Sequence, residues 1–405
     1  MDLNFIKSLV ERNRDTKIVM LVMDGLGGLP MERGGKTALE AAHTPNLDRL
    51  AAEGICGLHQ PVRTGVTPGS GPGHLGIFGY DPVTYQVGRG VLSALGIDFD
   101  LQPQDVAARG NFCTVNEQGV VVDRRAGRIS TEKNKELEEL VCSNLDISEV
   151  EVFMEPVKEY RFLLVLRGAE LSSAVTETDP LEVGEEPVRP EATLPTPEAK
   201  KTARIVRDFV DQVREILRDE KPANMVLLRG FSQQPEWPSM QEVFGLQAAA
   251  IAMYPMYRGV SKLIGMDALP VSHTVEEEFD LLEEKWNDYD FFFVHVKRID
   301  SAGEDGDFDR RVSLIEETDA LVPRLVDLHP DVIVVTGDHS TPAKMKYHSW
   351  HPVPVLLWSE FCRPDRVEQF GERACVTGSL GPRFPAFEIM PLALAHARRL
   401  GKYGA

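Results

Sequence analysis

Largely apolar runs that end near an acidic residue stand out along this chain. Residues 18–23 are all apolar, and this run stops at Asp24 in a glycine-rich stretch. Residues 291–296 and 332–335 form two later runs of the same kind, and the second leads into Asp338. Strands with apolar side chains on both faces are typical of a parallel sheet that is covered by helices. The pattern therefore predicts an α/β fold with a mostly parallel sheet.

A helix is predicted shortly after the first strand. Thr44 suits the N-cap position, and Pro45 stands where a helix tolerates proline. Leu47 and Leu50 share one face, and Gly54 suits the end of the helix. Helices of this kind would provide the cover that the apolar strands require.

A central block differs in character from the segments on either side of it. Residues 177–197 are acidic and rich in proline, which indicates a long surface loop, and a helix is predicted over about 197–218. A chain of 405 residues is also long for one core. We therefore expect a core domain formed by residues 1–91 and 241–405, and a smaller inserted α/β domain formed by residues 92–240.

The overall charge excludes one class of partner. The chain has 44 Lys and Arg residues against 63 Asp and Glu residues, which gives a net charge of −19. Such a field repels polyanions, so nucleic acid is not expected as a partner. A small anionic substrate remains compatible with this charge, because a local cluster of basic side chains and metal ions would bind it.

Cysteine usage and hydropathy bear on the location of the protein. The five cysteines include no CxxC pair, which favours reduced thiols over a disulfide framework. No stretch of 18 apolar residues occurs, and the first residues lack a basic region followed by an apolar run. We expect a cytoplasmic protein that is neither secreted nor embedded in a membrane, and the sequence indicates no oligomeric state.

Acidic and histidine residues after the predicted strands are candidates for a metal site. The carboxyl ends of the strands of an open α/β sheet form the usual location of a site. One such acid alone could simply cap a helix, but three coincident strand ends favour a shared cluster. Carboxylates and imidazoles together suit divalent Mn, Zn, Mg or Co, whereas carboxylates without a metal would repel one another. The candidate ligands are Asp24, Asp300, Asp338 and His339, with His348 and His351 in the following segment.

A candidate nucleophile lies in a glycine-rich segment. Ser70 is flanked by Gly69 and Gly71, and apolar residues just after it predict the start of a helix. A helix N-terminus favours a phosphate group, although a serine among glycine and proline is often only part of a turn. Coordination to a metal ion would activate the hydroxyl, and two ions about 3.5–4 Å apart would suit a phosphoryl transfer.

Two sets of segments carry a family resemblance. The first set resembles the alkaline phosphatase superfamily and consists of Met23-Asp24-Gly25-Leu26-Gly27, Thr44-Pro45-Asn46-Leu47-Asp48-Arg49-Leu50, Asp300-Ser301-Ala302-Gly303 and Thr336-Gly337-Asp338-His339-Ser340-Thr341-Pro342. The second set resembles the archaeal-type, cofactor-independent (2,3-bisphosphoglycerate-independent) phosphoglycerate mutases and consists of Pro68-Gly69-Ser70-Gly71-Pro72-Gly73-His74-Leu75, Phe78-Gly79-Tyr80-Asp81-Pro82, Gly88-Arg89-Gly90-Val91-Leu92 and His348-Ser349-Trp350-His351-Pro352-Val353-Pro354.

The resemblance implies an alkaline-phosphatase-like core with two divalent metal ions and a phosphoserine intermediate on Ser70. One ion would be bound by Asp24, Ser70, Asp338 and His339. The other would be bound by Asp300, His348 and a residue four positions after this aspartate. That residue is normally histidine in the family, and here it is Glu304.

The glutamate changes what we expect of the metal. Glu304 can still bind a divalent ion, but a carboxylate makes the site harder and more negative than an imidazole does, which favours Mn or Mg over Zn. Co and Zn remain possible ions. His351 is an alternative residue to fill the position of the missing histidine.

The resemblance also implies a substrate site that involves the inserted domain, with phosphoglycerate bound between two lobes. Arg124, Arg128 and Arg229 resemble the substrate-binding arginines, since guanidinium groups suit both a carboxylate and a phosphate. Ordinary surface arginines in a turn are the alternative interpretation. Lys262 is a further candidate phosphate contact, and Asp123 is a candidate general base.

The hypothesis is that the protein converts 3-phosphoglycerate to 2-phosphoglycerate through phosphoserine, without a bisphosphoglycerate cofactor. A metal-dependent phosphatase or another phosphomutase on the same scaffold is the nearest alternative, because fold alone does not determine substrate. A catalytically silent binding or scaffold protein is a rival from another class. Glu304 in place of histidine is the feature that favours this rival.

Overall fold

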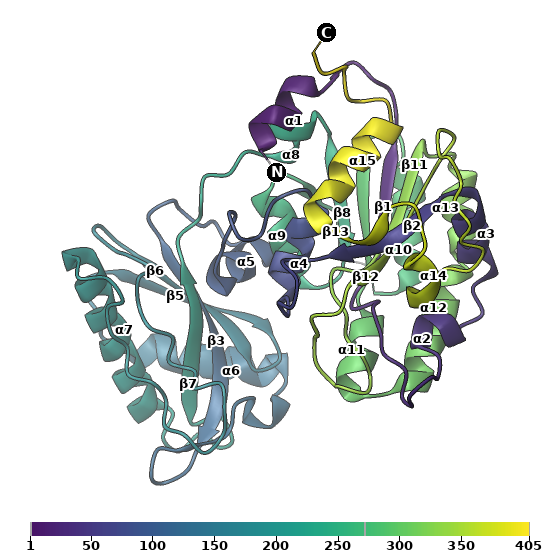
Figure 1. Ribbon diagram of the computed structural model, residues 1–405. Coiled ribbons are helices and arrows are strands. Elements are labelled where there is room, and N and C mark those ends of the chain that lie inside the picture. Colours follow the sequence, from purple (N-terminus) through teal and green to yellow (C-terminus); the bar gives the residue numbers. More distant parts are fainter. Residues whose placement is uncertain (1, 271–272, 405) are drawn as a thin grey trace. The chain divides into compact units, whose positions relative to one another are not determined.

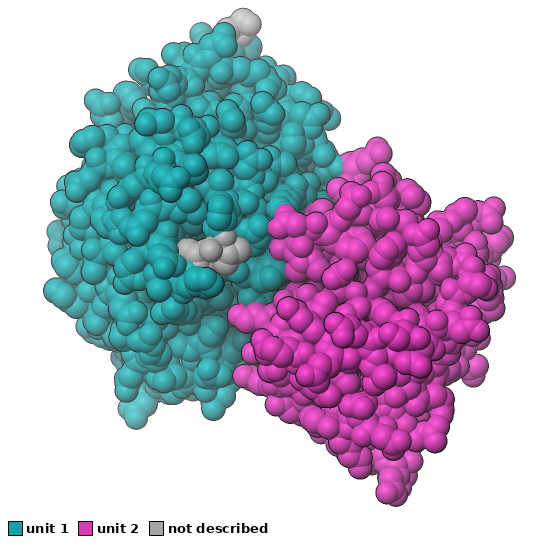
Figure 2. Space-filling model, turned by 180° about the vertical axis from the view of Figure 1, so that it is seen from behind, with its two compact units in different colours: residues 1–86, 237–405 teal, residues 87–236 magenta. Residues whose placement is uncertain are grey.

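The computed structural model describes residues 2–270 and 273–404 and divides into two compact units (Figures 1 and 2). The first unit consists of residues 1–86 and 237–405, and the second consists of residues 87–236. Within the described residues, no helix is both long enough and apolar enough to span a membrane.

Both boundaries between the units lie a few residues before the expected positions, for a local reason. Helix α5 (Arg89–Gly96) packs against strands β3 (Val106–Val115) and β7 (Met225–Ser232), which are part of the second unit. Trp237 instead lies against Tyr85 of the first unit, with ring centroids 5.4 Å apart. The helix therefore belongs to the second unit, and the tryptophan belongs to the first.

The first unit is built around an eight-stranded sheet, in the order β13-β2-β12-β11-β1-β10-β8-β9. Five of its strand pairs are parallel, and only the pairs that β12 makes with β11 and β2 are antiparallel. The fold class predicted from the apolar runs is therefore confirmed. The strands are β1 (Ile18–Met23), β2 (Ile55–Gln60), β8 (Ala248–Ala252), β9 (Asp267–Ala268), β10 (Phe291–Val296), β11 (Val332–Thr336), β12 (Val353–Ser359) and β13 (Gly381–Pro385).

Alternate residues of the central strands pack against helices on opposite faces of this sheet. Leu21 and Phe292 belong to a core cluster that also contains Leu50 of α3 (Pro45–Glu53) and Phe279 of α10 (Val275–Lys285). On the other face, Phe293 packs edge-to-face on the ring of Phe78, the C-cap residue of α4 (Ser70–Ile77), with centroids 4.8 Å apart. Burial on both faces explains why these strands are nearly continuous apolar runs.

The helices of the first unit are mostly short. The helix predicted after Thr44 runs from Pro45 to Glu53, with Gly54 at its C-cap. Among the described residues, these helices are α1 (Leu3–Leu9), α2 (Ala38–Ala41), α3 (Pro45–Glu53), α4 (Ser70–Ile77), α8 (Met240–Phe244), α9 (Pro255–Leu263), α10 (Val275–Lys285), α11 (Arg298–Asp305), α12 (Phe308–Asp319), α13 (Val322–Asp327), α14 (Glu372–Cys375), η2 (Ala386–Glu388) and α15 (Ile389–His396).

The second unit has its own antiparallel sheet and its own core. Strand β3 pairs with β4 (Val121–Asp123), β6 (Arg161–Arg167) and β7, and β5 (Glu151–Lys158) extends the sheet beyond β6. Two helices, α6 (Thr131–Asn144) and α7 (Pro197–Ile216), contribute apolar side chains to this core, and the short η1 (Ala126–Arg128) follows β4. The acidic, proline-rich stretch before α7 contains no helix or strand among its described residues, as expected for a loop.

Candidate metal site and nucleophile

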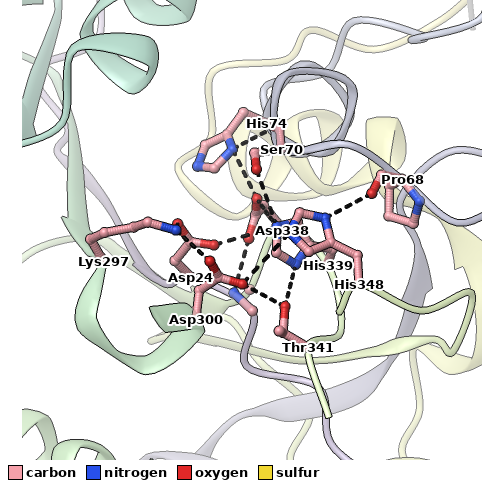
Figure 3. Close-up of polar contacts among 12 residues, drawn as sticks. Asp24, Pro68, Ser70, His74, Lys297, Asp300, Asp338, His339, Thr341 and His348 are labelled. Carbon is pink, nitrogen blue, oxygen red and sulfur yellow. Dashed lines mark hydrogen bonds and ion pairs between the residues drawn. The ribbon is translucent and has the colours of Figure 1, made fainter. Parts of the chain in front are cut away.

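The carboxyl ends of three adjacent strands bring the predicted acidic residues together (Figure 3). Strands β11, β1 and β10 are neighbours and run parallel. Asp24 follows β1 directly, Asp338 lies just beyond β11, and Asp300 lies in the first turn of α11, which begins just after β10. All three side chains are buried. The parallel sheet thus places these carboxylates at one edge.

Two groups of side chains at this edge have donor atoms within 4.8 Å of one another, close enough to hold a metal ion. The first group consists of Asp24, Asp338 and His339, and the second consists of Asp300, His339 and His348. Nε2 of His339 lies 3.4 Å from Oδ1 of Asp24 and 3.1 Å from Oδ2 of Asp338. The ring of His348 stacks on that of His339, with centroids 3.6 Å apart. His339 therefore joins the two groups.

Ser70 lies beside both groups, at the first position of α4. Its Oγ is 3.4 Å from Nε2 of His339. The close approach depends on Gly73, because a Cβ there would lie 2.5 Å from the carbonyl oxygen of Asp338. A helix N-terminus also favours a phosphate group. The position of Ser70 is thus compatible with a nucleophile in a phosphoryl transfer.

The buried oxygens of the first group fit a divalent cation. Neither carboxylate oxygen of Asp24 makes a hydrogen bond of good geometry, and Oδ2 of Asp338 makes none either, although all three atoms are inaccessible to water. Buried polar atoms are normally paired, and converging carboxylates repel one another. Oxygen and imidazole donors together suit Mn, Mg, Co or Zn. The donor set is therefore suited to a metal ion.

A lysine that the sequence pattern did not indicate lies between the two groups. Nζ of Lys297 is 3.2 Å from Oδ2 of Asp24, and it also contacts Oδ2 of Asp300 (Figure 3). Burial alone would lower the pKa of Lys297, but the two carboxylates raise it well above its ordinary value. Burial would likewise raise the pKa of Asp24, but Lys297 and His295 hold it well below its usual range. Both groups are therefore charged at neutral pH.

Two further side chains orient the acids and histidines. The hydroxyl of Thr341 donates a hydrogen bond of 2.6 Å to Oδ1 of Asp300 and lies 3.0 Å from Nδ1 of His339. Nδ1 of His74 lies 3.1 Å from Oδ2 of Asp338. Burial alone would lower the pKa of His74, but Asp338 raises it above the ordinary value. The sequence assigned no role to His74, and the structure places it in the site.

A buried arginine fixes the loops that carry the site. Arg311 of α12 donates to the carbonyl oxygens of Gly25 and Leu26, at 2.8 and 2.7 Å, and to that of Thr341. Burial lowers the pKa of Arg311 to about 10, so it stays protonated at neutral pH. These carbonyls belong to the loops that follow β1 and β11. Arg311 therefore holds the backbone beside Asp24.

Three other predicted residues lie outside both groups. Glu304 is exposed on α11, four residues after Asp300. Nδ1 of His351 is hydrogen-bonded with the hydroxyl of Ser349 at 2.9 Å. Lys262 lies partly buried on α9, and this burial lowers its pKa. The structure therefore places neither Glu304 nor His351 with the other candidate ligands.

The predicted substrate arginines lie in the second unit, where two of them surround one acid. Arg124 makes two hydrogen bonds to Asp179, of 2.9 and 2.7 Å, and Nη1 of Arg229 lies 3.6 Å from the same carboxylate. Arg128 is exposed, and the carboxylate of Asp123 accepts hydrogen bonds from two backbone N–H groups of the turn that follows it. Asp179 thus orders the guanidinium groups of Arg124 and Arg229, which the sequence analysis predicted as substrate-binding residues without linking them to each other.

The fold and the site define an α/β protein with a buried carboxylate–histidine cluster and an adjacent serine. A family model described as 2,3-bisphosphoglycerate-independent phosphoglycerate mutase matches residues 51–224. A protein of Aquifex aeolicus with the name probable 2,3-bisphosphoglycerate-independent phosphoglycerate mutase is 49% identical over 100% of both chains. A protein of Thermus thermophilus with the same name is 50% identical, again over 100% of both chains. The chain therefore belongs to the family of 2,3-bisphosphoglycerate-independent phosphoglycerate mutases.

Solved structures agree with this membership. The chain is similar to a protein from Pyrococcus horikoshii, with 30% identity and a TM-score of 0.81 over 96% of this chain and 99% of that one. It is also similar to the cofactor-independent phosphoglycerate mutase of Thermoplasma acidophilum. That match has 29% identity and a TM-score of 0.66, and it covers 94% of this chain and 100% of that one.

Proposed function

We propose that the protein interconverts 3-phosphoglycerate and 2-phosphoglycerate through a phosphoserine on Ser70, without bisphosphoglycerate. Family membership supports the overall reaction. The observation that carries the chemical route is the hydroxyl of Ser70, which lies 3.4 Å from His339, the residue common to both groups of candidate ligands. A serine needs such an activating environment because its hydroxyl is a weak nucleophile at its free pKa.

Two divalent ions, Mn or Mg in preference to Co or Zn, are part of the proposal. Asp24, Asp338 and His339 would hold one ion together with Ser70, and Asp300 and His348 would hold the other. When bound, the ions would supply Lewis-acid stabilisation of the charge on the transferred phosphoryl group. Glu304 remains a proposed ligand of the second ion, although its carboxylate is exposed and the conformation described does not bring it to Asp300.

The residues of the chain then have defined tasks. Oγ of Ser70 forms a bond to phosphorus as the bond from phosphorus to the 3-oxygen of the substrate breaks, and the proton of the serine passes to that oxygen. The glycerate is retained, and its 2-hydroxyl takes the phosphoryl group back from Ser70. Asp123 is the proposed general base that takes the proton of this hydroxyl, and this proton returns to Oγ of Ser70 as its bond to phosphorus breaks. Water has to be excluded in the meantime, because hydrolysis of phosphoserine would release phosphate.

The substrate itself would be bound by basic side chains. Arg124, Arg128 and Arg229 are proposed to bind its carboxylate and phosphate, and Lys262 is proposed as a further phosphate contact. Arg124 and Arg229 suit this task because Asp179 orders both guanidinium groups, and an arginine has five donors of which Asp179 occupies only some.

Phosphorus NMR tests the proposed function. The protein is loaded with Mn and incubated with 3-phosphoglycerate in the absence of bisphosphoglycerate, and signals of 2-phosphoglycerate and free phosphate are followed. Ser70→Ala is compared with Ser313→Ala, a control on α12. The proposal predicts 2-phosphoglycerate with the wild type and the control, and none with Ser70→Ala.

Each other result has a distinct meaning. Release of phosphate alone would identify a phosphatase, and the mutase assignment would fail. The absence of any reaction with Mn, Mg, Co and Zn would instead favour a silent binding or scaffold protein.

A further inference from the structure

Lys297 joins the two candidate metal groups of the site. It lies between β10 and α11, and its ammonium contacts one carboxylate oxygen of Asp24 and one of Asp300. These two residues come from different groups, and Figure 3 shows Lys297 beside both of them. The side chain is 22% exposed, and its Nζ lies 5.5 Å from the centroid of the Tyr257 ring. The ammonium is thus directed into the site, and little of the side chain reaches the surface.

The buried charges near this lysine are unbalanced without a second source of positive charge. Asp24, Asp300 and Asp338 are all buried, and each carboxylate when ionised carries one negative charge. Lys297 offsets one of the three. Arg311 is close by, but it donates to backbone carbonyl oxygens and not to these carboxylates. Two divalent ions together with Lys297 would carry two positive charges more than these three carboxylates, or one more if Glu304 also binds, and either excess is opposite in sign to the charge of about −2 on a phosphate group.

We propose that Lys297 is a catalytic residue whose ammonium donates hydrogen bonds to the transferred phosphoryl group. The proposal rests on the function proposed above. The same ammonium contacts carboxylate oxygens of Asp24 and Asp300, so it uses oxygens that a bound divalent ion would also use. A lysine suits both tasks, because its charge is compact, it has three donors, and its four-carbon stem is flexible.

If Lys297 has both roles, its replacement should raise the affinity for Mn and lower the rate of Ser70 phosphorylation. The ammonium competes with a divalent ion for the oxygens of Asp24 and Asp300. Lys297→Met should therefore bind Mn more tightly than the wild type, by about tenfold or more, because a positive charge close to the bound ion is removed. Phosphorylation of Ser70 should slow by about 100-fold, as is typical when one donor to a developing charge is lost.

A lysine that only stabilises the fold would behave differently. Its removal would weaken metal binding together with stability, because the loops that carry the ligands would loosen. The sign of the change in Mn affinity therefore distinguishes a residue that competes with the metal from one that supports the site.

The experiment compares Lys297→Met and Lys297→Arg with Lys285→Met, a control on α10 whose lysine pairs with Glu284. Calorimetry without substrate gives the Mn affinity, and rapid quenching at saturating Mn and 3-phosphoglycerate gives the rate of Ser70 phosphorylation. We expect Lys297→Met to gain affinity and lose rate, Lys297→Arg to recover part of the rate, and the control to match the wild type. Tryptophan fluorescence checks that each variant is folded.

Two results would overturn the inference. One is a fall in the Mn affinity of Lys297→Met while Lys297→Arg retains it, and the other is an unchanged rate of phosphorylation in Lys297→Met. If the wild type forms no phosphoserine at all, the proposed function fails first, and the catalytic role of Lys297 fails with it.

Discussion

Replacement of the buried arginine behind the site should destabilise the first unit and weaken metal binding. Arg311→Met keeps much of the side-chain volume and removes the guanidinium. The carbonyl groups of Gly25, Leu26 and Thr341 would then lose the hydrogen bonds that Arg311 donates to them. The loop after Asp24 would lose its anchor, so the affinity for Mn should fall as well.

The magnitude follows from the hydrogen bonds. A hydrogen bond to a charged group contributes about 1.5–3 kcal/mol net to stability. The bonds of 2.8 and 2.7 Å to Gly25 and Leu26 therefore predict a loss of about 3–6 kcal/mol in the free energy of unfolding. We expect a value near the lower end, about 3 kcal/mol, because the variant no longer has to bury a charge.

Urea unfolding followed by tryptophan fluorescence is the appropriate assay. All four tryptophans, at positions 237, 286, 350 and 358, lie in the first unit, so the signal reports on that unit. A chelator keeps metal binding out of the measurement. Arg310→Met is the matched control, because the exposed side chain of Arg310 contacts Ser313 and Glu317 of its own helix, and an exposed ion pair of this kind is worth under about 1 kcal/mol. A loss of less than about 1 kcal/mol in Arg311→Met, with unchanged Mn affinity, would refute the reasoning.

Two further predictions concern single acids. Burial raises the pKa of Glu372 to about 7, although Gly28 and Thr37 donate hydrogen bonds to its carboxylate. The folded state therefore binds this proton more tightly than the unfolded chain. The stability of the wild type relative to Glu372→Gln should fall by about 2–3 kcal/mol between about pH 4.5 and 7, and a constant difference in urea unfolding would contradict this. Glu304→His should shift the ratio of Mn to Zn affinity toward Zn by about tenfold in competitive titrations, and an unchanged ratio would show that Glu304 is not a ligand.

The strands and their acidic ends could be predicted because local pattern and tertiary position coincide there. A run such as residues 18–23 is apolar because both faces of β1 are buried. Asp24 follows at the edge of the sheet where the carboxyl ends of the parallel strands lie. Ser70 could be predicted for a similar reason, since Gly73 of the same glycine-rich segment is needed for close approach to Asp338.

The roles of Arg311, Lys297 and His74 could not be predicted, because each of them contacts a residue of the site that lies far away in the sequence. Arg310 and Arg311 are adjacent and chemically identical, yet one is exposed and the other is fully buried against the loop after β1. In the sequence, Lys297 is an ordinary polar residue after a strand, and only the folded structure shows that it contacts Asp24. His74 had one signal, its spacing of one helical turn from Ser70, but that spacing does not reveal contact with Asp338.

Detection of phosphoserine on Ser70 tests the central claim most directly. Mn-loaded wild type, Ser70→Ala and Ser313→Ala are mixed with 3-phosphoglycerate, quenched with acid during turnover and digested for mass spectrometry. The account predicts a phosphorylated peptide that carries Ser70 in the wild type and in Ser313→Ala, and neither phosphopeptide nor 2-phosphoglycerate in Ser70→Ala. Formation of 2-phosphoglycerate by Ser70→Ala, or phosphorylation at another residue during productive turnover, would contradict it.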